Sequence, residues 1–178
     1  VRRKGPIAEK IFQYGGLTCE KVREHTGFNP GWHIFRQVHD KFGGNLQCLI
    51  SGGAALSPDL QRGLSQLGFW ICEGYGLSET TATGTGTHPA KSRLGSVGPP
   101  LPKLEVRIDQ PDVNGIGEVC LRGPCVMKGY FRDPEATARA LRDGWLHTGD
   151  RGRLDADGYL TLAGRVDELI VTSGGKKA

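Results

Sequence analysis

The sequence lacks the features of several protein classes. No apolar run approaches the roughly 18 residues of a membrane-spanning helix, and no signal peptide is visible. The 23 Lys and Arg residues exceed the 19 Asp and Glu residues, for a net charge of +4. These positive residues form no basic stripe with interleaved aromatic residues, so we expect no nucleic-acid partner.

Paired cysteine motifs are also missing. The chain has five cysteines but no Cys-x-x-Cys pair, and no His/Cys spacing matches a set of zinc ligands. Four of the five lie in or beside apolar, strand-like runs. We therefore expect reduced, buried thiols in a cytoplasmic protein and no zinc site. The cysteines are Cys19, Cys48, Cys72, Cys120 and Cys125.

The length and the chain ends point to a piece of a larger protein. The 178 residues, 37% of them hydrophobic, suffice for one large domain or two small ones. The first residue is Val1, and the sequence stops on a Gly/Lys turn after the strand-like segment 168–172. Because a natural domain seldom stops on such a turn, we expect flanking sequence on both sides.

The first 90 residues predict an α/β layer. Strand-like segments at 46–50 and 69–73 flank a helix that begins at Ser57-Pro58-Asp59 and ends at Gly68. This order predicts a parallel strand pair with a right-handed crossover. Leu60, Leu64 and Leu67 are the expected buried stripe of the helix. An earlier helix, which Gly43-Gly44 ends, carries an apolar face of Ile34, Phe35, Val38 and Phe42.

After residue 90 the pattern changes to short strands. A helix begins at Asp133-Pro134, and Asp157-Gly158 is typical of a hairpin turn. The predicted fold class is thus α/β, with a parallel βαβ layer (1–90) followed by a mostly antiparallel β subdomain (91–164). The expected strands of this second part are 104–108, 117–122, 126–130, 146–148 and 159–162.

Polar residues gather where the first two strands end. Ser51-Gly52-Gly53-Ala54 follows one strand, and Glu73-Gly74-Tyr75-Gly76 ends the next, ahead of a Ser/Thr/Gly cluster that contains Glu79. Neighbouring parallel strands open at the same edge, so the two loops should share a ligand. A tyrosine between glycines suits a purine, and hydroxyls with a carboxylate suit a metal-bound phosphate. A plain turn and a packed aromatic are the alternative interpretations.

Two later motifs add a carboxylate and a positively charged guanidinium. His147-Thr148-Gly149-Asp150 puts a carboxylate just past a strand, where it can accept both hydroxyls of a ribose. The alternative is an ordinary turn residue. Gly164-Arg165-Val166-Asp167 contains an arginine whose commonest role would be a surface ion pair.

Taken together, these motifs resemble those of the adenylate-forming superfamily, which includes acyl-CoA synthetases, luciferases and the adenylation domains of peptide synthetases. The resemblance covers about residues 45–178, and segments 126–130 and 168–176 are most similar to long-chain fatty acyl-CoA synthetases. The segments that carry it are 74–80 (GYGLSET), 117–124 (GEVCLRGP), 129–137 (GYFRDPEAT), 144–150 (GWLHTGD) and 164–170 (GRVDELI).

The resemblance implies part of a large N-terminal domain and assigns a role to each site residue. Ser78 would contact the α-phosphate, where most members have Thr, and Glu79 would hold Mg²⁺. Asp150, helped by Arg165, would bind the ribose. Residues 165–178 would be a hinge, centred on Asp167, and the start of a C-terminal domain. Tyr75 would stack on adenine, and Gly52, Gly53, Ala54, Glu73, Gly74 and Gly76 would complete the nucleotide site.

The implied activity is an AMP-forming ligase that activates a long-chain fatty acid with ATP and transfers it to coenzyme A. The family's phosphate-gripping loop and adenylation lysine have no match here; Lys176 and Lys177 do not correspond to that lysine. We therefore expect the isolated chain to be inactive. Two alternatives stay open: a domain that loads an amino acid onto a carrier protein, and a nucleotide-binding pseudoenzyme module. Peripheral membrane association and the oligomeric state also stay open.

Overall fold

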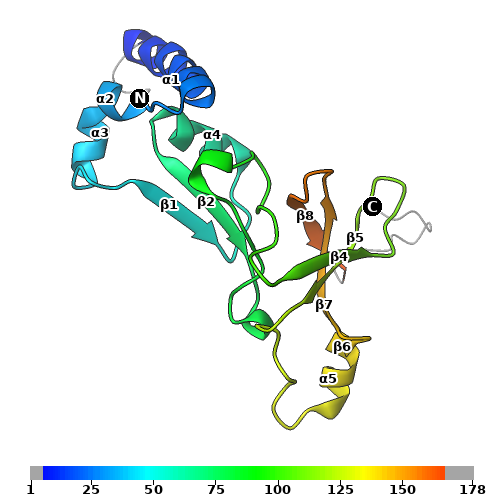
Figure 1. Cartoon of the computed structure of the whole chain (residues 1–178). Helices are drawn as coiled ribbons and strands as arrows, with labels where there is room; N and C mark the ends of the chain where they lie inside the picture. Colours follow the sequence, from blue (N-terminus) through cyan, green and yellow to red (C-terminus); the bar gives the residue numbers. More distant parts are fainter. Residues whose placement is uncertain (1–5, 167–178) are drawn as a thin grey trace. The chain divides into compact units, whose positions relative to one another are not determined.

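The computed structural model describes residues 6–166 (Figure 1). The chain forms two compact units, which we call the helical unit (Val1–Cys72 and His88–Gly95) and the sheet unit (Glu73–Thr87 and Ser96–Ala178). The chain therefore passes from one unit to the other more than once. The expected boundaries at residues 90 and 164 stay predictions.

The helical unit contains α1 (Pro6–Thr26), α2 (Gly31–Ile34), α3 (Arg36–Lys41), β1 (Cys48–Gly52), α4 (Pro58–Gln66) and η3 (Pro89–Lys91). As predicted, Gly43 and Gly44 end α3, and Gly68 follows α4, all with positive φ. Gly68 is also a point of close approach, because a Cβ there would lie 2.6 Å from the Gly31 carbonyl carbon. A side chain at Gly68 would therefore push the two segments apart.

The predicted apolar face of the earlier helix is wrong. The helix breaks at Phe35, which has φ −103° and ψ 28°, so residues on either side do not share one face. Ile34 and Phe42 are exposed, whereas His39 is 2% exposed and lies 2.9 Å from the Leu67 carbonyl oxygen through Nε2. The imidazole packs against Phe69, with ring centroids 4.2 Å apart.

The buried stripe predicted for α4 is wrong at Leu60, its first position. Leu60 is 53% exposed, and its neighbour Gln61 is 3% exposed. The Gln61 amide donates to Ser92 Oγ at 3.4 Å and accepts from the Gly95 backbone N–H at 3.1 Å. These bonds explain why a polar side chain takes the inward position. Ser57 precedes the helix as predicted, but its side chain caps no backbone N–H among the described residues.

A three-stranded sheet has the order β1-β2-β3, where β2 is Trp70–Tyr75 and β3 is Thr85–Gly86. The α4 helix connects the neighbouring strands β1 and β2, which is the predicted βαβ arrangement. Strand β3 pairs antiparallel with β2 and places Tyr75 opposite Thr85. The second strand is longer than predicted, since it continues through Gly74 and Tyr75 rather than ending at Glu73.

The sheet unit is built on antiparallel strands, as predicted: β4 (Glu105–Asp109), β5 (Gly117–Arg122), β6 (Leu141–Arg142), β7 (Trp145–Leu154) and β8 (Leu160–Arg165). The order is β4-β5-β7-β6, and β8 pairs with the long strand β7. Its apolar cluster is centred on Val119, Leu121 and Leu160, none of them exposed, and includes Tyr75. This cluster anchors the strands from which the candidate site is built.

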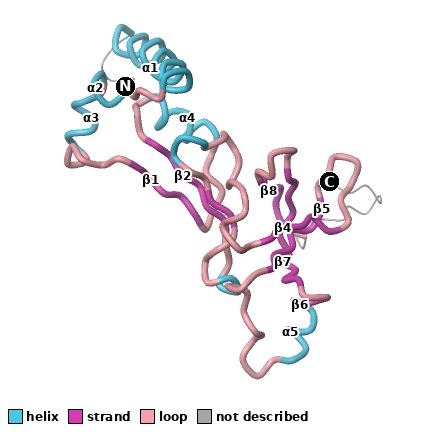
Figure 2. The backbone as a smooth tube through the Cα atoms, viewed as in Figure 1, coloured by secondary structure: helices cyan, strands magenta, loops and turns pink. Residues whose placement is uncertain are grey.

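One predicted strand of the sheet unit is not formed. Residues 126–130 lie in the loop between β5 and α5 (Pro134–Ala140), as Figure 2 shows. A single isolated bridge joins Tyr130 to Asp133. The helix itself begins as predicted, because Asp133 Oδ1 accepts a hydrogen bond from the Ala136 backbone N–H at 2.8 Å.

Candidate functional site

Three predicted site residues from distant parts of the sequence meet in the sheet unit. Asp150 on β7 and Arg165 on β8 are register partners, and Tyr75 comes from the end of β2. The Tyr75 hydroxyl donates to Asp150 Oδ2 at 2.7 Å. Arg165 Nη1 donates to Asp150 Oδ1 at 3.0 Å. The carboxylate is thus held through both of its oxygens.

The protonation state of Tyr75 supports this arrangement. Burial, and to a smaller extent the Asp150 carboxylate, raises the pKa of the Tyr75 hydroxyl far above its ordinary value. The phenol therefore stays neutral and keeps the proton that it donates. Each carboxylate oxygen has two lone-pair directions, so each keeps acceptor capacity for a ligand. The Asp150 side chain is 15% exposed, which leaves that capacity reachable.

The loop after Tyr75 is tightly folded. A Cβ at Gly76 would lie 2.5 Å from the Ala82 carbonyl group. A Cβ at Gly84 would lie 2.5 Å from the backbone carbonyl oxygen of Tyr75. Thr81 and Ala82 both have left-handed backbone conformations, with φ of 54° and 56°. Strained residues of this kind cluster at ligand sites and persist where the surrounding structure fixes them.

A buried threonine fixes this loop from inside. Thr80 is fully buried, and its Oγ1 accepts a hydrogen bond from the Leu77 backbone N–H at 3.1 Å. The short 3₁₀ turn η2 (Ser78–Thr80) therefore leaves Ser78 exposed and Glu79 half-buried. These are the two residues predicted to contact phosphate and Mg²⁺.

Glu79 has a partner that the sequence did not reveal. Tyr130 donates its hydroxyl hydrogen to Glu79 Oε1 at 2.8 Å, and the pKa of Tyr130 is raised chiefly by this hydrogen bond. The Met127 backbone N–H donates to the Glu79 carbonyl oxygen at 2.7 Å. The only sequence signal for Tyr130 was its place in the family-like Gly129-Tyr130 motif. The loop 126–130 therefore serves as a support for Glu79 rather than as a strand.

The remaining predicted site residues differ in burial and in the unit where they lie. Glu73 is 5% exposed, and its backbone N–H and carbonyl pair with Thr87 in the interior of the sheet unit. Gly74 lies inside β2, between Glu73 and Tyr75. Gly52, Gly53 and Ala54 lie in the helical unit, exposed, at the carboxyl end of β1, and Gly53 has φ +78°. Asp167 lies outside the described residues.

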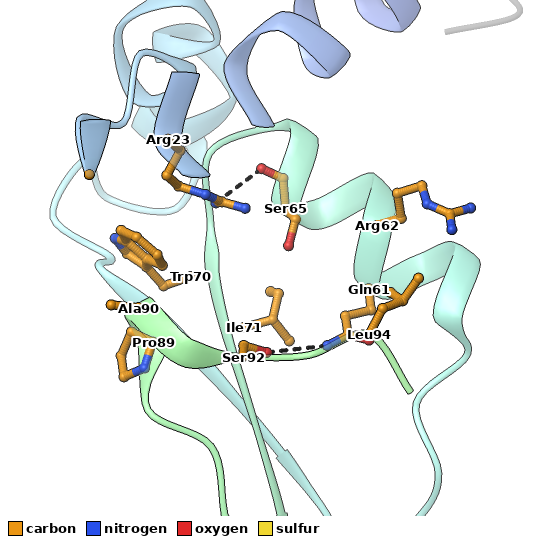
Figure 3. Close-up of a pocket in the computed structure, with 11 residues that line it drawn as sticks. Arg23, Gln61, Arg62, Ser65, Trp70, Ile71, Pro89, Ala90, Ser92 and Leu94 are labelled. Atoms are coloured by element: carbon orange, nitrogen blue, oxygen red, sulfur yellow. Dashed lines mark hydrogen bonds between the residues drawn. The ribbon is translucent and has the colours of Figure 1, made fainter. Parts of the chain in front are cut away.

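A cavity of about 290 Å³ lies elsewhere, in the helical unit (Figure 3). Its polar side chains are used in packing: Arg23 Nη1 donates to the carbonyl oxygens of Ser65 and Phe69, both at 3.3 Å. The Arg23 guanidinium also lies 4.8 Å from the centre of the Trp70 ring. The described residues that line this cavity include none of the predicted site residues, so we do not place the site there.

Within residues 6–166, no helix combines the length and the apolar character needed to cross a membrane.

Comparison with known proteins identifies the family. The sequence profile of the AMP-binding enzymes matches residues 7–131. The chain belongs to the AMP-binding enzyme family. It is 43% identical to the long-chain-fatty-acid–CoA ligase ACSBG1 of Mus musculus over 181 residues, covering 99% of this chain and 25% of that protein. It is 38% identical to long chain acyl-CoA synthetase 1 of Arabidopsis thaliana, covering 98% of this chain and 28% of that protein.

Solved structures of this family have the same fold. MenE from Bacillus subtilis, in complex with ATP and a magnesium ion, superimposes with a TM-score of 0.66 at 29% identity, covering 80% of this chain and 32% of that chain. ATP-bound MatB from Rhodopseudomonas palustris gives a TM-score of 0.66 at 37% identity. That match covers 72% of this chain and 27% of the MatB chain. The predicted family and fold class are therefore confirmed. The chain spans only about a quarter of the length of the curated relatives.

Proposed function

We propose that this chain is the nucleotide-binding part of an AMP-forming long-chain acyl-CoA synthetase. The named relatives are long-chain fatty acid–CoA ligases, and MenE has been solved with AMP, with an acyl-adenylate and, as a double mutant, with a coenzyme A product analogue. In the parent protein, a fatty acid carboxylate would attack the α-phosphorus of ATP and release pyrophosphate. The thiol of coenzyme A would then displace AMP from the acyl-adenylate.

The observation that carries this proposal is the Asp150 carboxylate, held between Tyr75 and Arg165. A carboxylate with both oxygens fixed and acceptor capacity remaining suits the two hydroxyls of a ribose. Because Tyr75 is only 9% exposed, it would contact adenine through the small exposed part of its ring. Its hydroxyl would position Asp150.

Ser78 and Glu79 would face the phosphate side of the nucleotide. Glu79 would hold Mg²⁺ through the carboxylate oxygen that is not bonded to Tyr130, and the exposed Ser78 hydroxyl would contact the α-phosphate. One carboxylate beside a hydroxyl suits this cation, which in nucleotide sites takes most of its ligands from water and phosphates. Mg²⁺ would supply neutralisation of the negative charge that otherwise repels the attacking carboxylate.

The other predicted nucleotide residues complete the proposal. Gly52, Gly53 and Ala54 would approach the base through an exposed turn without bulky side chains. Glu73, Gly74 and Gly76 would shape the backbone around Tyr75, and Asp167 would act as the hinge. All five cysteines are free of disulfide bonds, which suits the cytoplasm as the compartment. The long-chain relatives favour fatty acid over the amino acid and pseudoenzyme alternatives.

The ribose role can be tested in the parent protein by combining an Asp150→Ala variant with a modified ligand. Losing charge-assisted hydrogen bonds should cost about 1.5–3 kcal/mol, or roughly a tenfold to hundredfold increase in the Kd for ATP. Because the contact is to the hydroxyls, the variant should bind 2′,3′-dideoxy-ATP as well as the unmodified protein does. Glu135→Ala, which removes a negative charge from an 88%-exposed side chain on α5, is the matched control.

Two results would count against the assignment. Unchanged ATP affinity in Asp150→Ala would remove the ribose role, and an equal loss for dideoxy-ATP would show that the residue acts without contacting the hydroxyls. The isolated chain should show no ATP–pyrophosphate exchange, because it has no match to the phosphate-gripping loop or the adenylation lysine. Exchange that disappears on Glu79→Ala would contradict that expectation.

A further inference from the structure

A second group of potential ligand residues lies on one face of the strands β5 and β7. Glu118 and Cys120 are two residues apart on β5, and a shift in the β5–β7 register lies between them. His147 on β7 is the register partner of Cys120. One donor atom from each residue lies within 4.8 Å of the other two. The group thus offers a carboxylate oxygen, a sulfur and an imidazole nitrogen at one point of the sheet unit.

The hydrogen-bond geometry does not fit a nucleophilic cysteine with a histidine base. Such a relay uses one imidazole nitrogen for the thiol and the other for the orienting acid. Here both contacts converge on His147 Nδ1, which lies 2.8 Å from Glu118 Oε2 and 3.4 Å from Cys120 Sγ. A single nitrogen with one proton or one lone pair cannot relay between both groups. Three potential ligand atoms within 4.8 Å of one another are instead an arrangement that a single metal ion can bridge.

One of the two measured distances already matches a tetrahedral ion, and the other requires a small movement. Zinc bonds of about 2.3 Å to sulfur and 2.0–2.1 Å to nitrogen and oxygen place tetrahedral donor atoms roughly 3.4–3.6 Å apart. The sulfur–nitrogen distance already has this value, at 3.4 Å. The nitrogen–oxygen distance of 2.8 Å would have to open by about half an ångström. The Glu118 side chain is 21% exposed and the His147 side chain 8%, whereas Cys120 is fully buried, so an ion would reach the group past Glu118.

The surrounding charges set the conditions for binding. Burial, then the negative charges of Glu118 and Asp109, raise the pKa of Cys120 to about 11, so an incoming cation must displace the thiol proton to water. Arg107 partly offsets this rise, because its hydrogen bond and positive charge lower the pKa of Cys120. Arg142 lies 3.5 Å from Glu118 Oε2 through Nη2, but its side chain is 52% exposed and free to turn toward solvent.

We propose that Glu118, Cys120 and His147 bind one soft divalent metal ion of the zinc type. A thiolate and an imidazole favour such an ion over Mg²⁺, so this site is separate from the magnesium position at Glu79 and does not rest on the proposed ligase function. Glu118 Oε1 accepts a hydrogen bond from the Gly149 backbone N–H at 3.0 Å. Metal bound to Glu118 would therefore tie β5 to β7 directly beside Asp150.

Cobalt titration of the complete chain tests this site, because a thiolate ligand gives Co²⁺ an intense charge-transfer absorption that carboxylates cannot give. The band should saturate at one Co²⁺ per chain, disappear when Zn²⁺ is added, and survive excess Mg²⁺. Cys120→Ser should abolish the band, and His147→Gln should weaken Zn²⁺ binding at least tenfold. Cys125→Ser, which changes a half-buried thiol of the same unit outside the group, should retain the band.

The proposal is overturned if the unmodified chain gives no band, if Cys120→Ser keeps it, or if Cys125→Ser loses it. Far-ultraviolet circular dichroism checks that each variant is folded. Where Cys120→Ser does not fold, the His147→Gln and Glu118→Gln variants replace it. Zinc affinity equal to that of the unmodified chain in both of these variants would likewise reject the site.

Discussion

Removing the hydroxyl of Tyr75 should destabilise the chain by a predictable amount. In Tyr75→Phe, Asp150 Oδ2 loses a 2.7 Å hydrogen bond from a neutral donor. Hydrogen bonds to charged groups contribute about 1.5–3 kcal/mol, and the 15% exposure of the Asp150 side chain lets water replace part of it. We therefore expect the free energy of unfolding to fall by about 1–2 kcal/mol. Tyr75→Ala should cost more, about 3–5 kcal/mol, because it also empties a core position.

Urea unfolding of the complete chain measures this change. With a slope of about 2 kcal/mol/M, the Tyr75→Phe midpoint should fall by about 0.5–1 M while the slope stays constant. Tyr14→Phe, at a tyrosine that is 69% exposed, is the matched control and should stay within about 0.5 kcal/mol of the unmodified chain. A Tyr75→Phe midpoint equal to that of Tyr14→Phe would refute the role of the hydroxyl.

A double-mutant cycle then shows whether Asp150 is the partner. Tyr75→Phe should cost much less in an Asp150→Ala background than in the unmodified chain, because the acceptor is already gone. Arg165→Ala alone should cost only about 0–1 kcal/mol, since its side chain is 47% exposed. Equal costs of Tyr75→Phe in both backgrounds would show that the hydroxyl stabilises the fold through some other group.

The remaining predictions concern four single substitutions. Gly76→Ala should lower the free energy of unfolding by about 1–3 kcal/mol, because its Cβ would lie 2.5 Å from Ala82. A Cβ at Gly63 in α4 would have no atom within 4 Å, so Gly63→Ala should instead raise the free energy of unfolding by about 0.5–1 kcal/mol. Thermal unfolding of both variants checks that the two changes have opposite signs. Asp133→Ala should cost about 1 kcal/mol through the lost α5 cap, measured by urea unfolding against Glu135→Ala. The backbone N–H groups of Ile116 and Asn114 lower the pKa of Asp112, so its stabilisation is present above the ordinary Asp pKa and is lost as the pH falls through the lower folded value. The difference in unfolding midpoint between the unmodified chain and Asp112→Asn should therefore shrink as the pH falls below the ordinary Asp pKa. A constant difference would contradict this origin.

Local chemistry predicted the parts of the fold that depend on neighbouring residues. The Asp133 cap, the glycines at 43, 44 and 68, and the strands predicted after residue 90, except 126–130, follow from short-range rules, and the structure confirms them. The inward face of α4 did not follow, since Gln61 is drawn inward by Ser92 and Gly95, about thirty residues later. Apolar periodicity alone could not predict hydrogen bonds to so distant a segment.

The candidate site shows the same division. The family-like motifs named Tyr75, Asp150 and Arg165, but only the folded chain brings a tyrosine and a carboxylate separated by 75 residues within hydrogen-bonding distance. Tyr130 was missed because nothing near it in the sequence signals that it supports Glu79. The predicted absence of a zinc site rested on linear spacing, which cannot detect Cys120 and His147 facing each other across two strands.

The position of Asp150 depends on irregularities in the sheet. The β5–β7 register shifts between Glu118 and Cys120, and the β7–β8 register shifts between Asp150 and Gly152. Such bulges turn side chains away from the regular alternation and are common beside active sites. Here Gly149, with φ +72°, donates its backbone N–H to Glu118.

Asp150 is held by its backbone as well as by its side chain. Its own N–H donates to Thr148 Oγ1, whose hydrogen is given to the Val119 carbonyl oxygen. With Tyr75 and Arg165 on the carboxylate, little conformational freedom remains for a ligand to remove. A conservative change such as Glu118→Gln, which keeps the oxygen facing Gly149 but weakens its charge, should therefore disturb nucleotide binding in the parent protein much less than Asp150→Ala does. Equal losses in the two variants would mean that the bulge, rather than the Asp150 carboxylate, determines nucleotide affinity.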